Sequence, residues 1–67
     1  MPLIQISLAE GRTPEQLRQL VAEVTEVAIR VANAPKEAVS VIITEVAPTM
    51  WATGDVTVQE RRDQAAK

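Results

Sequence analysis

Hydrophobic and polar positions alternate in the first segment of the chain. From Ile4 to Leu8 every second residue is a large aliphatic one, and the residues between them are polar. In an extended backbone, successive side chains point to opposite faces, so this pattern predicts a strand over residues 3–8 with one strongly apolar face. Gly11, which adopts positive φ without steric cost, lies in the turn that ends the strand.

The next segment has the periodicity of an amphipathic helix. Thr13 suits the N-cap, Pro14 the first helical position, and Gln16 the third position of a capping box. The residue before Pro35 is disfavoured in the helical region, so the helix should end there. We therefore predict a helix over residues 14–33. Its apolar stripe consists of Leu17, Leu20, Val21, Val24, Val27, Ala28 and Val31.

A run rich in β-branched residues follows and predicts a second strand over residues 38–46. The run is apolar on both faces, which indicates burial on both sides. Gly54 and Asp55 lie between two short apolar stretches, so we expect a short hairpin or arm over residues 51–58. Residues 59–67 are polar and are expected to form a frayed or helical tail.

This order predicts a single α+β domain over residues 1–67. A strand, a crossover helix and a second strand form a parallel pair with a right-handed connection. A chain of 67 residues buries only about 60% of the surface that its unfolded form exposes. Two strands and one helix cannot cover a strand that is apolar on both faces, so we expect a homo-oligomer in which identical chains share the core.

The composition excludes several classes of protein. At 46% hydrophobic residues the chain is too apolar for intrinsic disorder. The absence of cysteine and histidine excludes disulfides, Cys/His zinc sites and hydrolytic triads. Seven basic against nine acidic side chains and a single tryptophan argue against nucleic-acid binding. No apolar run approaches a membrane span or a signal peptide, so we expect a cytoplasmic protein without a membrane partner.

Candidate catalytic groups are few. The two glycines are isolated, so there is no phosphate-binding loop. Glu10 and Glu45 are the carboxylates that we consider as acid–base groups, and solvated strand-end residues are the simpler interpretation of both. Pro2 follows Met1, and removal of Met1 would leave a free secondary amine.

An α-amino group titrates at roughly 7.7–8.0 in ordinary peptides, and an apolar pocket or a nearby cation lowers that pKa. The amine of Pro2 would then be a usable general base. From the residues alone, the simpler interpretation of Pro2 is a residue that starts a strand.

Four short segments form a recognisable set by their order and spacing on a chain of this length. They are Met1-Pro2-Leu3-Ile4-Gln5-Ile6, Glu10-Gly11-Arg12-Thr13-Pro14-Glu15-Gln16, Ala34-Pro35 and Val41-Ile42-Ile43-Thr44-Glu45. The set resembles the 4-oxalocrotonate tautomerase family over residues 2–51. The resemblance implies a β-α-β tautomerase fold with a short C-terminal hairpin, dimers with a four-stranded sheet, and a hexamer built as a trimer of dimers with shared active sites. It also implies catalysis without a metal or organic cofactor.

Three residues match the functional positions of that family. Pro2 matches the catalytic proline, which moves a proton from the 2-hydroxyl of a dienol to a distant carbon. Arg12 matches the arginine that grips a substrate carboxylate, and next to Pro2 it would also lower the pKa of the amine. Trp51 stands where the family has an aromatic residue that keeps the pocket dry. A solvated turn arginine and a core or interface anchor are the alternative interpretations of Arg12 and Trp51.

Ser40 departs from the family pattern. The best-known members have a second arginine there, which reaches a neighbouring subunit's site. Arg61 and Arg62 are possible replacements if the tail folds over such a site, although a solvated pair is the simpler interpretation. Loss of charge stabilisation of this kind costs on the order of 10²–10³ in rate. We therefore expect a weak, promiscuous tautomerase.

The function that this resemblance implies is that of an isomerase, a 2-hydroxymuconate (4-oxalocrotonate) tautomerase-like enzyme. Its substrates would be small 2-hydroxy-dienoate or 2-oxo acids, such as 2-hydroxymuconate or phenylenolpyruvate. One alternative is hydratase- or dehalogenase-like addition of water to an activated alkenoate, with Pro2 as general acid. Another is a non-enzymatic oligomeric binding protein whose pocket has decayed.

Overall fold

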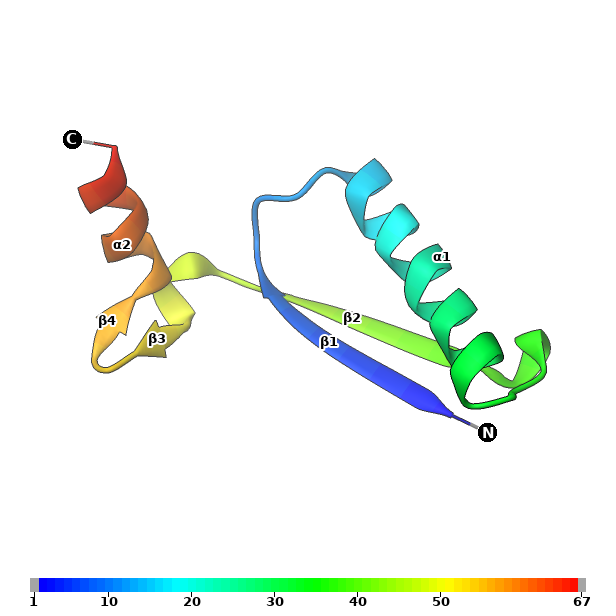
Figure 1. Cartoon of the computed structure of the whole chain (residues 1–67). Coiled ribbons are helices and arrows are strands. Elements are labelled where there is room, and N and C mark those ends of the chain that lie inside the picture. The colour runs from blue at the N-terminus through cyan, green and yellow to red at the C-terminus, as the bar shows by residue number, and fades with distance from the viewer. Residues whose placement is uncertain (1, 67) are drawn as a thin grey trace.

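The computed structural model describes residues 2–66 and contains a strand pair, a helix across one face of it, and a projecting C-terminal arm (Figure 1). The expected removal of Met1 and the last residue of the predicted tail lie outside the described residues. The elements are β1 (Leu3–Ala9), α1 (Pro14–Val31), η1 (Lys36–Ala38), β2 (Ser40–Val46), η2 (Pro48–Met50), β3 (Ala52–Thr53), β4 (Val56–Thr57) and α2 (Val58–Ala65).

The strands β1 and β2 are parallel, and α1 connects them, so the β-α-β fold predicted from the sequence is confirmed. Leu3 lies opposite Ser40 and Ala9 lies opposite Val46. The alternation in β1 is preserved, because Ile4, Ile6 and Leu8 are half-buried while the residues between them are exposed.

The start of α1 follows the predicted capping chemistry. The backbone N–H of Gln16 donates to the Thr13 hydroxyl at 3.1 Å, and that of Thr13 donates to the Gln16 side chain at 2.9 Å. The helix ends at Val31, two residues before the predicted end, because Asn33 adopts a left-handed φ of 54°. Asparagine tolerates this conformation at helix C-termini better than most residues do.

One further difference concerns β2, whereas the tail takes the helical one of its two expected forms. The strand begins at Ser40 because the residues after Pro35 form the single turn η1, with the Ala38 N–H donating to the Pro35 carbonyl at 2.9 Å. The polar tail is the ordered helix α2, whose capping box pairs Thr57 with Glu60.

The arm contains the short hairpin β3–β4. Gly54 and Asp55 connect its strands and have φ values of 57° and 68°. Positive φ at both central positions is the type I′ geometry that matches the twist of a hairpin. The backbone N–H of Val58 then donates to the Trp51 carbonyl at 2.8 Å, which fixes the start of α2 beside the start of the hairpin.

The core of one chain is thin. Among residues 2–66, only Ala28 and Ala34 fall below one-tenth exposed, whereas Leu3 is 55% and Ile42 48% exposed on the sheet. Val31, a member of the predicted apolar stripe, is 73% exposed at the end of α1.

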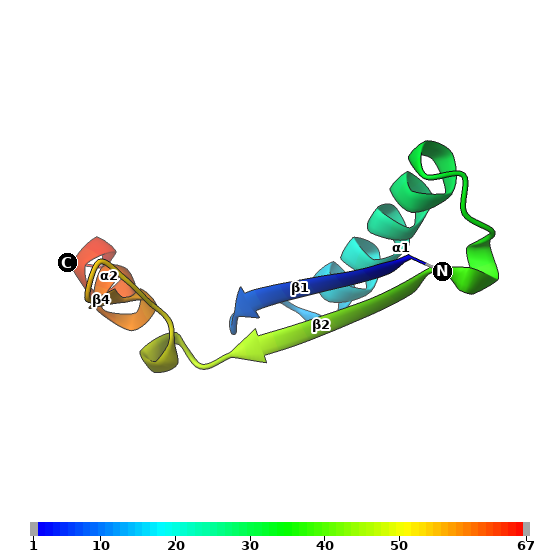
Figure 2. The same ribbon diagram turned by 90° about the horizontal axis from the view of Figure 1, so that it is seen from below.

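The molecule is also elongated, with extents of 46 × 24 × 16 Å, because the arm extends away from the strand pair (Figure 2). Its radius of gyration is 15.2 Å, against about 11 Å for a compact chain of this length. Neither described helix has the length and apolar character needed to cross a membrane.

Candidate functional site

A pocket of about 290 Å³ lies between the carboxyl end of β1 and the C-terminal arm. Parts of the chain that are far apart in sequence form it, because the arm returns beside the turn that follows β1. Its walls are mainly apolar, two guanidinium groups lie among them, and no carboxylate is found among its lining residues. The lining residues are Ser7, Leu8, Ala9, Arg12, Trp51, Val58 and Arg62.

The turn after β1 positions Arg12. Its Nη1 donates to the carbonyl oxygen of Ala9 at 3.0 Å, which holds the guanidinium against the end of the strand. Trp51 follows η2 and forms part of the pocket wall. It is 36% exposed, so it is still open to solvent. The structure thus brings two of the predicted site residues into one pocket.

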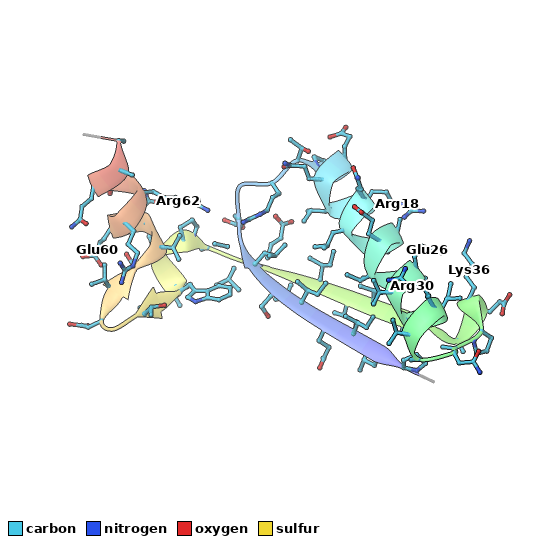
Figure 3. All side chains as sticks on the ribbon, in the orientation of Figure 1. Arg18, Glu26, Arg30, Lys36, Glu60 and Arg62 are labelled. Atoms are coloured by element: carbon cyan, nitrogen blue, oxygen red, sulfur yellow. The ribbon has the colours of Figure 1, made fainter. Side chains whose placement is uncertain are left out.

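The helix α2 directs its two arginines differently. Arg61 Nη2 donates to the carbonyl oxygen of Thr53 at 3.2 Å, so this side chain is held against the hairpin. Arg62 lines the pocket and extends from α2 toward the turn after β1 (Figure 3). The difference follows from helical geometry, since adjacent residues point about 100° apart around the axis.

Pro2 and Ser40 lie at the opposite end of the strand pair. They are neighbours there, because the Ser40 N–H donates to the Pro2 carbonyl at 3.0 Å. The length of β1 separates them from Arg12, about 20 Å at the usual rise per residue. Within one chain, therefore, Arg12 does not lie next to Pro2, although the resemblance implied that the two residues are neighbours.

A larger hollow of about 560 Å³ lies on the outer side of α1. All of its lining residues come from that single helix, so the hollow is a shallow surface between neighbouring side chains. Functional groups from different parts of the chain do not meet there. The labelled charges of α1 and η1 lie at the other end of the molecule from Arg62 (Figure 3). They are Arg18, Glu26, Arg30 and Lys36.

Sequence reasoning missed part of the pocket wall. Ser7 and Leu8 line the pocket although they were assigned only to a strand, and Val58 lines it from the start of α2. A usable signal was present for α2, because Thr57 and Glu60 have the spacing of a capping box. Recognising it would have predicted an ordered helix and separated the directions of its two arginines.

The capping box also affects ionisation. The pKa of Glu60 is lowered from its ordinary value, chiefly because its carboxylate accepts a hydrogen bond from the backbone N–H of Thr57. The Thr57 side chain and the charge of Arg61 act in the same direction. The ionised form of Glu60 therefore supports the start of α2.

Comparison with known proteins agrees with this architecture. Residues 2–61 match the family model described as "Tautomerase enzyme". A probable tautomerase of Streptococcus mutans is 58% identical over 45 residues, which cover 67% of this chain and 74% of the relative. The chain therefore belongs to the tautomerase family.

Two solved structures show the same fold. One is TomN, a 4-oxalocrotonate tautomerase homologue of the tomaymycin biosynthetic pathway, with a TM-score of 0.89 and 40% identity over 92% of this chain and 95% of that one. The other is a heterohexamer 4-oxalocrotonate tautomerase from Chloroflexus aurantiacus, with a TM-score of 0.86 and 35% identity over 90% of this chain and 97% of that one. Membership of this family supports an isomerase function of the tautomerase type.

Proposed function

We propose that the protein is a cofactor-independent keto–enol tautomerase in which the amine of Pro2, freed by removal of Met1, is the general base. The substrates are small 2-hydroxy-dienoate or enolpyruvate-type acids. The observation that carries the proposal is the pocket that joins Arg12 and Trp51, has apolar walls and has no carboxylate among its lining residues. Such a pocket attracts a carboxylate and places apolar side chains around the rest of a conjugated acid.

The reaction then needs only a proton relay. The neutral amine of Pro2 takes the proton from the 2-hydroxyl of the dienol, and the O–H electron pair becomes the carbonyl π bond. The conjugated π electrons shift along the chain, and the ammonium of Pro2 returns the proton to the distant carbon. Arg12 holds the carboxylate, and the indole of Trp51 covers the apolar part of the substrate.

Because Pro2 and Arg12 are separated by the length of β1, the complete site needs a second copy of the chain. A copy related by a two-fold axis runs its strands in the opposite direction and so can bring its Pro2 to this pocket. The exposed Leu3 and Ile42 and the elongated shape support such an assembly. We propose a homo-oligomer with shared sites, of the hexameric kind known among relatives of this fold.

The test is the rate of ketonisation of phenylenolpyruvate and 2-hydroxymuconate, followed by ultraviolet absorbance. We expect Pro2→Ala to lower kcat by about 10² or more, the range for a positioned general base. The matched control is a form of the protein that retains Met1, as verified by mass spectrometry. In this form Pro2 is present, but its nitrogen is part of a peptide bond and cannot act as a base. This form should be as slow as Pro2→Ala, and equal activity of all three forms would contradict the proposal.

A further inference from the structure

Arg62 is the second arginine of the pocket. It lies one residue beyond the segment 2–61 that matches the family model. The structure nevertheless places it on the pocket wall with Arg12, while Arg61, its neighbour in sequence, is turned to the Thr53 carbonyl. The two arginines carry the same charge and belong to the same helix, but only Arg62 faces the pocket.

The guanidinium of Arg62 lies beside Gly11 in the turn after β1. A β-carbon built at Gly11 would lie 3.4 Å from Nη2, 3.5 Å from Nη1 and 3.7 Å from Cζ of Arg62. The three distances are similar, so the guanidinium faces the position that a β-carbon of Gly11 would occupy. Gly11 also has a φ of 140°, a backbone conformation that residues with side chains rarely adopt.

The two guanidinium groups approach the same short turn. Arg12 is hydrogen-bonded to Ala9, and Arg62 lies beside Gly11, only two residues further along the chain. With no carboxylate among the lining residues of their shared pocket, the two like charges are left without a compensating acidic side chain in its wall. A bound anion would supply that compensation, and guanidinium groups recognise carboxylates through paired N–H donors.

We infer that Arg12 and Arg62 together clamp one carboxylate of the substrate, and that Arg62 is a substrate-binding residue of this enzyme. The inference rests on the proposed tautomerase function and deepens it. Since the clamp needs a single carboxylate, it fits acids with one carboxylate as well as diacids. It also supplies a second cation to a site whose position 40 is a serine.

The experiment measures binding without turnover. Hexanoate and adipate have six carbons each and carry one and two carboxylates, and neither has an enol proton to transfer. Each is titrated calorimetrically into the full-length protein, into Arg62→Gln and into Arg61→Gln. The two variants lose one charge each from the same helix, so Arg61→Gln controls for net charge.

We expect Arg62→Gln to weaken both ligands by about 10-fold, the effect of removing a charged hydrogen-bond donor. Arg61→Gln should stay within about 2-fold of wild type, because an exposed charge outside the pocket contributes little. Arg62→Lys should be intermediate, since it keeps the charge but not the paired donors. The double variant Arg12→Gln/Arg62→Gln should lose less than the product of the single effects, because both groups hold the same carboxylate.

Two results would overturn the inference. Equal effects of Arg62→Gln and Arg61→Gln would show that only net charge matters. A loss confined to adipate would show that Arg62 holds a distant second carboxylate instead. Because the titrations involve no proton transfer, failure of Pro2 as the base would leave them unaffected, and the two proposals can fail separately.

Discussion

At the scale of single residues, the orientation of a few side chains determines the candidate site. The hydrogen bond of Arg12 to the Ala9 carbonyl restricts its guanidinium to the end of β1. A side chain fixed in this way loses less entropy when a carboxylate binds than a free surface arginine does. The location of Arg12 in the pocket, and not its charge alone, therefore makes it suited to hold substrate.

Replacing Arg12 should chiefly weaken substrate binding. We expect Arg12→Ala to lower kcat/KM for phenylenolpyruvate by about 10- to 100-fold, the value of one charge-assisted contact. Arg18→Ala is the matched control, since Arg18 is an exposed arginine on the outer side of α1. Steady-state kinetics on both variants measure the effect. If the two variants lose the same amount, Arg12 is a solvated turn residue.

The site could be predicted from the sequence only in part. Arg12 and Trp51 were named from the resemblance, and the structure places both in one pocket. The sequence left Arg61 and Arg62 equivalent, because the choice between them depends on how α2 packs against the turn after β1. The separation of Pro2 from Arg12 within one chain can be predicted from the sequence, since a whole strand lies between the two residues.

At the scale of elements, the capping boxes of α1 and α2 define where both helices begin. The periodicity of apolar residues predicts α1 and β1 well, because a period of 3.6 or 2 reflects contact with one partner surface. The strand β2 is instead predicted from its run of β-branched residues. Periodicity says little about α2, which has no apolar stripe to reveal it. The observed end of α1 and the observed start of β2 differ from the predicted ones. The reason is that Asn33 and Pro35 impose local backbone conformations that the spacing of apolar residues does not reveal.

The start of α2 should depend on pH through Glu60. The pKa of Glu60 is lower in the folded protein than in the unfolded chain. Its ionised form therefore stabilises the helix fully at any pH above the unfolded pKa. This stabilisation is lost as the pH falls through the lower, folded-state pKa. We expect the protection factors of the amides in residues 58–65, each taken relative to the intrinsic exchange rate at the same pH, to fall as the pH drops below about 4.5.

The matched control is Glu60→Gln, whose side chain can still accept the bond from Thr57 but does not titrate. Other carboxylates titrate in both proteins, so the difference between the two profiles reports Glu60 alone. Hydrogen exchange followed by NMR measures it. Identical pH profiles in wild type and Glu60→Gln would show that the carboxylate has no part in holding α2.

At the scale of the whole molecule, one chain is an incomplete structure. It has a thin core, exposed Leu3 and Ile42 on the sheet, and an arm that projects from the body. The doubly apolar β2 had already indicated a missing layer. Which surfaces of the copies meet does not follow from a single sequence, since many apolar faces can pair.

Mixing two impaired variants should raise activity above that of either one if the sites are shared. Pro2→Ala keeps an intact Arg12, and Arg12→Ala keeps an intact Pro2. When the two proteins are denatured together and refolded at equal amounts, about a quarter of the sites should receive both intact residues by random association. We expect the ketonisation rate to rise to about that fraction of wild type.

Each variant refolded alone is the control, and sedimentation must show the same multimer in every sample. Activity of the mixture equal to the average of the two separate variants would mean that Pro2 and Arg12 never meet across subunits.

The separation of Pro2 from the pocket along β1 has an evolutionary consequence. In the proposed shared assembly, each gene product donates its base to one site and its arginines to another, so a single mutation at either end of the strand damages a site that a neighbouring subunit completes. In a cell with one copy of the gene, selection acts on both ends together. After duplication, one copy can lose the base and the other the pocket without loss of every site, and each then becomes indispensable to the other.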